Sequence, residues 1–388
     1  MEQNEITKRE FLRLSLLGAG AASCGIFCKR QSFASKYSDF NIQGETISGF
    51  NESWQIESRY YVNTPKGLKC QICPNECKML VNETGDCKTK INIDNRLICI
   101  AYGNPCAIHV DPIEKKPLFH FYPGSSAYSI ATAGCNLACL NCQNWEISQS
   151  SPKSTQNYDL PPDKVVTECI RNNCKSIAYT YSDPVAFYEY TMDTAVFARK
   201  NGIKNVVVSA GYINEKPLRE WCKCIDAAHI DLKSFSNEIY EMLNAGTLDP
   251  VLSTLKVMKE EGIWLEIVNL VIPSWTDDLD MIKSMCHWLA LNGFIDTPLH
   301  FSRFQPLYKL ANLPSTPVDM LETAREAAMS EGLNYVYIGN VPGSTAENTY
   351  CPKCKKIVIS RKGYRILEKN LTNGECNNCH SAIAGIWE

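Results

Sequence analysis

The sequence predicts an α/β protein with a mainly parallel sheet. From about residue 126 to residue 345, strand-like segments alternate with longer helix-like segments, which is the pattern of a parallel barrel or a doubly wound sheet. The cysteines add a second observation, because most of them fall into three compact groups in or beside this region. The 388 residues suffice for one large domain with appendages or for two domains.

Strands and helices are expected to alternate along this region. Right-handed crossovers would gather the carboxyl ends of the strands on one rim, where the active sites of such barrels lie. The predicted strands are Ser129–Ala133, Ser176–Tyr181, Asn205–Ser209, His229–Leu232, Trp264–Ile272, His300–Phe304 and Asn334–Ile338. The predicted helices run from Pro184 to about Lys200, from Pro250 to about Gly262, from Asp280 to Leu291 and from Val318 to Glu331.

The composition excludes some classes of function. A formal net charge of -3 gives no electrostatic case for nucleic acid as the main partner. Beyond the first thirty residues, no apolar run reaches the length of a spanning helix. Twenty cysteines, clustered in C-x-x-C pairs, favour metal ligation over a disulfide framework.

Cys135, Cys139 and Cys142 form a C-x3-C-x2-C run in a loop that Gly134 opens. A 4Fe-4S cluster takes one thiolate per iron, so three thiolates without a nearby fourth leave one iron open for chemistry. A glycine-led loop is a poor place for cysteines that only fill space. We therefore expect this trio to hold a 4Fe-4S cluster.

A second group precedes the barrel region and contains enough thiolates to close a metal shell. It lies in the cysteine-rich region 58–125, and its spacing suits zinc or a 4Fe-4S cluster equally well. A closed shell of this kind would be structural or would relay electrons. Its members are Cys70, Cys73, Cys77 and Cys87.

The C-terminal segment 346–388 carries a third group, formed by the pairs Cys351/Cys354 and Cys376/Cys379. Two such pairs predict a small metal-ribbon-like unit that binds zinc or another metal. Cys376–His380 also fits the C-x-x-C-H attachment motif of a c-type haem. That alternative leaves Cys351 and Cys354 without a purpose, and the tail offers no second axial ligand.

The segments around the trio carry a resemblance to a known family. The C-x3-C-x2-C spacing is the signature of radical S-adenosylmethionine (SAM) enzymes. Nearly all of the sequence after residue 60 resembles the radical SAM enzymes of the AmmeMemoRadiSam system. These are relatives of the pyruvate formate-lyase activating enzymes, the activases that install glycyl radicals. The resemblance rests on Asp111–Gly124, Gln143–Gln149, Tyr179–Tyr181, Ile230–Lys233, His300–Phe304 and Tyr337–Val341.

The resemblance implies a partial (βα)6 barrel, part of a TIM barrel, over residues 126–345. It also implies that SAM binds the open iron of the cluster, and that ferredoxin or flavodoxin supplies an electron. SAM is then cleaved to methionine and a 5'-deoxyadenosyl radical, which abstracts hydrogen from the substrate. The expected activity is that of an activase-like oxidoreductase or modifying enzyme. Its substrate would be a protein or a small metabolite.

Two candidate SAM contacts follow the second and third predicted strands. Asp183 stands where the family carries a Gly-Gly-Glu-like element, so its carboxylate would accept from the SAM ammonium. It is also a candidate N-cap for the helix expected from Pro184, and the two roles are compatible. Gly211 would let the backbone approach a ligand closely, although Ala210 stands where the family more often has asparagine.

The later strands supply the other candidates. Asp231 and Lys233 alternate with apolar residues, so both would face the lumen, where Lys233 would pair with the SAM carboxylate or with Asp231. The planar guanidinium of Arg303 suits a carboxylate of SAM or substrate. Gly339 and Asn340 would line the adenine pocket.

Residues 1–31 resemble a twin-arginine leader, with Lys8 before Arg9 and a mildly apolar stretch after Arg13. An amphipathic helix or a frayed end is the alternative, and residues 32–57 are expected to be a polar linker. Export or membrane association would conflict with the cytoplasmic supply of SAM and reductant. The sequence therefore leaves the localisation open.

Two other classes of protein compete with the enzyme. In an electron-transfer protein, all three cysteine groups would hold closed clusters and SAM would not be cleaved. In a metal-stabilised scaffold, the barrel would have lost catalysis. Departures from the family pattern at Asn141, Asp183 and Ala210 keep the second alternative open.

Overall fold

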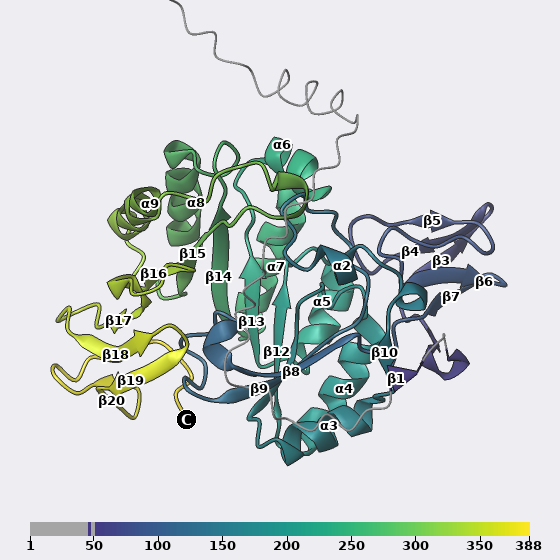
Figure 1. The fold of residues 1–388 in the computed structure, drawn as a ribbon, viewed down its shortest axis with the longest axis horizontal. Coiled ribbons are helices and arrows are strands. Elements are labelled where there is room, and N and C mark those ends of the chain that lie inside the picture. The colour runs from purple at the N-terminus through teal and green to yellow at the C-terminus, as the bar shows by residue number, and fades with distance from the viewer. Residues whose placement is uncertain (1–45, 48–50) are drawn as a thin grey trace, which may run out of the picture. The chain divides into compact units, whose positions relative to one another are not determined.

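The computed structural model describes residues 46–47 and 51–388, so the predicted leader and most of the predicted linker lie outside the described residues. In this part of the chain the largest sheet has eight strands in the order β16-β15-β14-β13-β12-β11-β9-β8 (Figure 1). Neighbours are parallel except β8, which is antiparallel to β9. The strands are β8 (Ala107–Pro112), β9 (Ser126–Ala131), β11 (Ser176–Tyr179), β12 (Lys204–Ser209), β13 (Ala227–Asp231), β14 (Trp264–Val271), β15 (Leu299–Arg303) and β16 (Val336–Gly339).

Helices connect the parallel strands, which confirms the partial (βα)6 barrel, with β16 following the last helix. None of the described helices is both long and apolar enough to cross a bilayer. The strands that the sequence predicts are confirmed within a few residues, whereas β8, α3 and α5 were missed. The crossover helices are α3 (Pro162–Arg171), α4 (Tyr188–Lys200), α5 (Glu215–Cys222), α7 (Leu248–Glu260), α8 (Leu279–Leu291) and α9 (Val318–Ser330).

Helix α4 begins at Tyr188, four residues after the predicted start at Pro184. The Asp183 carboxylate accepts from Val185 N at 3.0 Å, and the Asp183 carbonyl accepts from Ala186 N at 3.0 Å. These bonds hold the residues after Asp183 in a turn. The prediction that Asp183 is the N-cap was therefore wrong, because that position belongs to Phe187.

The N-terminal cysteine-rich region consists of two small antiparallel sheets beside the barrel (Figure 1). A buried ion pair between Lys90 and Glu189 ties one of them to α4. Removing one partner of such a pair leaves an uncompensated buried charge, which makes this contact a strong anchor. The strands are β2 (Ile56–Glu57), β7 (Arg96–Cys99) and β6 (Lys90–Ile93) in one sheet, and β3 (Tyr61–Thr64), β4 (Gly67–Cys70) and β5 (Lys78–Met79) in the other.

Residues 113–121, which we call the floor segment, cross the lumen at the amino ends of the strands. Glu266, near the start of β14, is fully buried and accepts from Phe119 N at 2.9 Å and from His120 N at 2.7 Å. It also accepts from His300 Nε2 at 2.8 Å. A buried carboxylate is stable only when it is well paired, so these donors fix the segment to the barrel.

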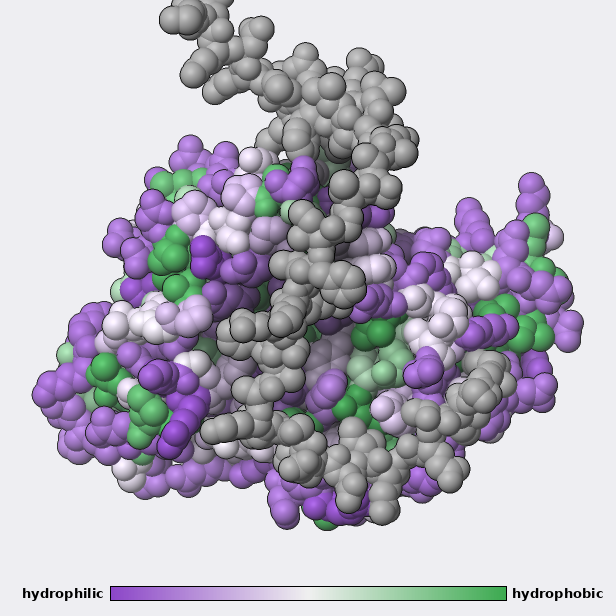
Figure 2. Space-filling model, in the orientation of Figure 1, coloured by the Kyte–Doolittle hydropathy of each residue, from purple (hydrophilic) through white to green (hydrophobic). Residues whose placement is uncertain are grey.

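The C-terminal unit, residues 346–388, packs against the floor segment. Arg361 Nη2 donates to the Phe119 carbonyl at 2.8 Å, and Ile386 N donates to the His120 carbonyl at 2.7 Å. Figure 2 shows apolar patches over this unit and over the β3–β5 sheet, among mostly hydrophilic residues. The strands are β17 (Thr349–Tyr350), β18 (Ile357–Lys362), β19 (Arg365–Lys369), β20 (Leu371–Thr372) and β21 (Glu375–Cys376).

His120 links the floor segment to β16 and to the C-terminal unit, and its titration should make the stability of the fold depend on pH. Its Nδ1 lies 2.6 Å from the Ala384 carbonyl and its Nε2 lies 2.5 Å from the Tyr337 hydroxyl. Burial lowers the pKa of His120 to about 4, against about 6.5 in an unfolded chain. Between these values the unfolded chain takes up a proton that the folded chain does not. Stability should therefore fall as the pH drops from about 6.5 toward 4.

We expect His120→Gln to reduce the pH dependence of the unfolding free energy by about one proton in this range, as measured by denaturant titrations at several pH values. The matched control is His287→Gln, because His287 is exposed and its Nδ1 lies 3.0 Å from Glu331 at the surface. An unchanged slope in His120→Gln would contradict the assignment of a neutral buried imidazole.

Candidate functional site

The cysteine trio lies in the loop between β9 and the short helix α2 (Trp145–Ser148). Gly134, which opens the loop, has φ +101°, and a Cβ atom there would lie 2.4 Å from Thr89 Cγ2 and 2.5 Å from the Cys87 carbonyl oxygen. Only glycine fits this conformation and this close approach. The trio loop therefore packs directly against the second cysteine group.

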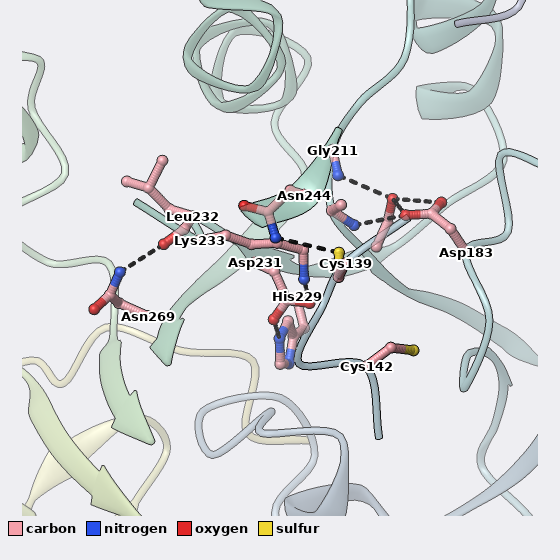
Figure 3. Close-up of polar contacts among 12 residues, drawn as sticks. Cys139, Cys142, Asp183, Gly211, His229, Asp231, Leu232, Lys233, Asn244 and Asn269 are labelled. Carbon is pink, nitrogen blue, oxygen red and sulfur yellow. Dashed lines mark hydrogen bonds and ion pairs between the residues drawn. The ribbon is translucent and has the colours of Figure 1, made fainter. Parts of the chain in front are cut away.

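A π-helical turn, Tyr240–Asn244, holds the trio loop from the other side. The Asn244 carbonyl accepts from Ala138 N at 3.0 Å, and its side-chain Nδ2 donates to Cys139 Sγ at 3.2 Å (Figure 3). Such π-helical turns occur often at functional sites. Asn244 was not among the predicted site residues, since nothing in the local sequence pattern distinguishes it from a surface asparagine.

The trio lines a pocket of about 500 Å³, within the usual range for a small-molecule site. The pocket lies at the carboxyl ends of β11 to β15, as the barrel geometry predicts. Floor-segment residues, Asn244 and Tyr364 of the C-terminal unit complete the lining. Among the described residues that line it, Cys135, Cys139 and Cys142 are the only cysteines.

Four of the seven residues predicted to contact SAM line this pocket: Asp183, Asp231, Lys233 and Asn340. Their contact with SAM remains a prediction, but the fold does bring them together with the trio. The other three, Arg303, Gly211 and Gly339, do not line the pocket within the described part of the chain.

Arg303 requires a correction, because its side chain lies away from the pocket. Ser302 lines the pocket, and adjacent side chains on a strand point to opposite faces. Arg303 Nε donates to the Thr316 carbonyl at 2.7 Å. In this conformation the guanidinium anchors a loop and does not clamp a ligand.

The two glycines are explained by packing. Gly211 has φ +66°, and a Cβ atom there would lie 3.0 Å from Ile230 Cγ2. At Gly339, a Cβ atom would lie 3.1 Å from Ser302 Oγ. Tight neighbours inside the protein thus account for both positions without a ligand.

Asp183 organises the pocket wall through its buried carboxylate (Figure 3). It accepts from Ser209 Oγ at 3.0 Å and from Ala210 N at 2.8 Å, besides Val185 N. Burial raises the pKa of this carboxyl group, and these hydrogen bonds partly offset the effect. Both oxygens already have protein donors, so positioning the loop after β12 is the role that the geometry shows.

Asp231 forms the centre of a charged row on the lumen face of β13. Lys233 Nζ lies 2.9 Å from Asp231 Oδ2, and His229 Nε2 lies 2.9 Å from Asp231 Oδ1 (Figure 3). Burial disfavours the charge on Lys233, but the Asp231 carboxylate outweighs it and raises the pKa of Lys233. Burial likewise opposes ionisation of Asp231, whereas Lys233 and His229 keep its pKa well below the usual range. Two partners were predicted for Lys233, the SAM carboxylate and Asp231. The structure shows the ion pair with Asp231.

The floor segment orients this row from below. The Lys116 carbonyl lies 2.8 Å from His229 Nδ1, and Lys116 Nζ donates to Asp111 Oδ2 at 2.6 Å. The hydroxyl of Tyr181, a residue with φ 64°, also donates to Asp111. His229 was not among the predicted site residues, although its position two residues before Asp231 on the same strand face was an available signal.

The two four-cysteine groups differ in geometry. All four ligand sulfurs of the C-terminal group lie within 4.8 Å of one another. No other set of three or more candidate metal ligands in the described ranges is this compact. In the N-terminal group, Cys77 Sγ lies 3.4 Å from Asp86 Oδ2 and Cys87 Sγ lies 3.1 Å from Thr89 Oγ1.

Comparison with known proteins identifies the family. Residues 129–286, which include the trio and the strands β11 to β14, match the model of the radical SAM superfamily. An uncharacterized protein of Methanocaldococcus jannaschii is 43% identical over 318 residues, which cover 81% of this chain and 95% of that protein. The chain belongs to the radical SAM superfamily. It is therefore an enzyme of a family that uses a 4Fe-4S cluster and SAM.

More distant proteins are similar to parts of the chain. The 4-hydroxyphenylacetate decarboxylase activating enzyme of Clostridium scatologenes is 21% identical over 198 residues, which cover 49% of this chain and 61% of that enzyme. The crystal structure of SuiB from Streptococcus suis bound to S-adenosylmethionine has a TM-score of 0.45 and 12% identity, covering 62% of this chain and 56% of that one. The narrower assignment to the AmmeMemoRadiSam system remains a proposal.

Removing the Asp183 carboxylate should destabilise the radical SAM barrel. In Asp183→Ala, the Val185 and Ala210 amides and the Ser209 hydroxyl lose a buried acceptor, at a cost of about 1–3 kcal/mol for each unsatisfied group. We expect a thermal midpoint several degrees below wild type, with Asp183→Asn in between. The control is Asp280→Ala, at a 96% exposed side chain. Equal midpoints for Asp183→Ala and the control would contradict this role.

Proposed function

We propose that Cys135, Cys139 and Cys142 hold a 4Fe-4S cluster and that SAM binds beside it in the 500 Å³ pocket. The observation that carries the proposal is the ligand count. The described residues that line the pocket supply three thiols and no fourth, which leaves one iron for SAM.

The pocket residues fit these cofactors. Asn141 and Asn244 line the pocket, and the side-chain oxygen of each is buried without a hydrogen-bond partner in the described structure. Unpaired buried acceptors are costly, and a ligand with N–H or O–H donors, such as the ammonium, adenine and ribose groups of SAM, would satisfy them. The thiols themselves are the ligands that iron-sulfur clusters require.

When bound, the cluster and SAM supply a one-electron cleavage of SAM to methionine and a 5'-deoxyadenosyl radical that abstracts hydrogen from the substrate. The chain holds and orients the reactants and excludes water. Asn244 donates to Cys139 and fixes the trio loop. Lys233 places a positive charge beside the pocket, where it would attract the SAM carboxylate, while Asp231 would attract the ammonium.

A protein substrate and an activase-like reaction form the finer part of the proposal. They are supported by the similarity to the activating enzyme of Clostridium scatologenes and by the resemblance to the AmmeMemoRadiSam enzymes. A reduced ferredoxin or flavodoxin would supply the electron. The N-terminal cysteine group packs against the trio loop at Gly134, so a cluster bound there would be well placed to pass electrons to the trio.

The test is anaerobic reconstitution followed by reduction with dithionite in the presence of SAM and an assay for 5'-deoxyadenosine. Wild type should form it, and Cys139→Ala should lose at least 99% of the rate because the cluster loses a ligand. The matched control is Cys286→Ala, which changes a buried cysteine on α8 and should remain active. Equal rates for wild type and Cys139→Ala would contradict the role of the trio. No product from wild type with a full iron content would contradict the proposal and favour the electron-transfer alternative.

Lys233→Met should weaken SAM binding, because it removes the positive charge that would attract the SAM carboxylate. It also leaves the Asp231 carboxylate without its lysine partner. We expect the Kd of the reconstituted protein for SAM to rise about tenfold or more, equivalent to about 1.4 kcal/mol. Lys233→Arg should recover part of the affinity. Lys164→Met changes an exposed lysine on α3 and serves as the control in equilibrium dialysis. A wild-type Kd for Lys233→Met would contradict a role of Lys233 in binding SAM.

A further inference from the structure

The sulfurs of the C-terminal cysteine group have the spacing of ligands around a single ion. Cys351 Sγ lies 3.6 Å from Cys379 Sγ, and Cys354 Sγ lies 3.7 Å from Cys376 Sγ. A tetrahedral site with zinc-sulfur bonds of about 2.3 Å places its sulfurs about 3.8 Å apart. A disulfide would need about 2 Å, and sulfurs that bind different irons of a cluster lie farther apart than those sharing one ion.

The backbone of the two C-x-x-C turns provides a second observation, because both turns have the same hydrogen bonds. Cys351 N donates to the Lys356 carbonyl at 2.8 Å, and Lys355 N donates to the Cys351 carbonyl at 2.9 Å. The second turn repeats both bonds, from Cys376 N to Ser381 at 2.9 Å and from His380 N to Cys376 at 2.9 Å. Two equivalent turns thus present two sulfurs each to one point.

In each turn, the residue in the left-handed backbone conformation also stands at the same position relative to the cysteines. Lys355 has φ 59° and His380 has φ 55°, each four positions after the first cysteine of its pair. His380 is therefore the counterpart of a lysine in the turn, which argues against its role as a haem ligand.

We propose that Cys351, Cys354, Cys376 and Cys379 bind one zinc ion as a closed tetrathiolate site, and that this ion fixes the floor of the catalytic barrel. Four protein ligands leave no open position, so the ion is structural. Zinc is favoured over copper and iron because it suits a tetrahedral set of four thiolates and has no redox chemistry.

The path from the metal unit to the pocket is continuous. Arg361 on β18 donates to the Phe119 carbonyl and, through Nη1, to Thr349 Oγ1 at 2.7 Å. The tail pairs with the floor segment as well, since Phe121 and Ile386 form an isolated parallel bridge. At the tip of the hairpin between β18 and β19, Tyr364 lines the pocket itself. Loss of the ion should therefore loosen the floor without removing any ligand of the trio.

Metal analysis tests the site in a background that lacks the trio, with Cys135, Cys139 and Cys142 all changed to alanine. Adding Cys354→Ser and Cys379→Ser should lower the zinc content by about one per chain, whereas Cys73→Ser with Cys77→Ser should leave that zinc bound. Zinc content that is unchanged by Cys354→Ser and Cys379→Ser would overturn the proposal, as would a loss of iron in place of zinc.

Because the serine variants can unfold the small unit, cobalt substitution of the chain with intact C-terminal cysteines gives an independent readout. The Co²⁺ form should show the strong visible bands and the thiolate charge-transfer absorption of a tetrahedral four-sulfur site. Added zinc should displace the cobalt, and these absorptions should disappear. Weak bands typical of octahedral cobalt would overturn the assignment.

Hydrogen exchange tests the coupling to the floor. Chelation of zinc from the trio-free protein should speed amide exchange at residues 113–122 at least tenfold, because the partners of these residues in the C-terminal unit become mobile. Exchange in α3 should stay unchanged and serves as the internal control. Unchanged exchange at residues 113–122 after complete removal of zinc would overturn the proposed link. None of these readouts requires cleavage of SAM, so they stand apart from the proposed activity.

Discussion

The buried carboxylate of Glu266 holds the floor segment in place and, through it, the C-terminal unit. Burying a carboxylate costs several kcal/mol unless donors surround it, and here His300 and the amides of Phe119 and His120 do so. The floor segment is thereby held across the amino ends of the barrel strands. It sets the Lys116 carbonyl against His229 and offers the edge on which the C-terminal unit docks.

The other end of the barrel depends on a loop that has little regular structure. Gly134 lets the trio loop press against Cys87, and Asn244 holds it through one backbone and one side-chain hydrogen bond. Asp183 fixes the neighbouring wall in the same way. The site is thus positioned by polar contacts from several strands, which is how a barrel can present an irregular loop with defined geometry.

The sequence was most informative where the chemistry is local. The spacing of Cys135, Cys139 and Cys142 predicts the ligand set, and strand alternation places Asp231 and Lys233 on one face. It could not decide which face of β15 is inward, because that depends on the pairing of Ser302 with Leu270 on another strand, and Arg303 was misassigned. Glu266, Asn244 and the floor segment act across more than a hundred residues, beyond what local patterns reveal.

If the trio leaves one iron open to SAM, binding of SAM must change the electron paramagnetic resonance spectrum of the cluster. The protein should be reconstituted with Cys73→Ser and Cys77→Ser, so that the N-terminal group contributes no signal, and then reduced. We expect a [4Fe-4S]⁺ spectrum whose g-values shift on addition of SAM. A spectrum that remains unchanged at a saturating concentration of SAM would show that SAM does not bind an open iron of this cluster.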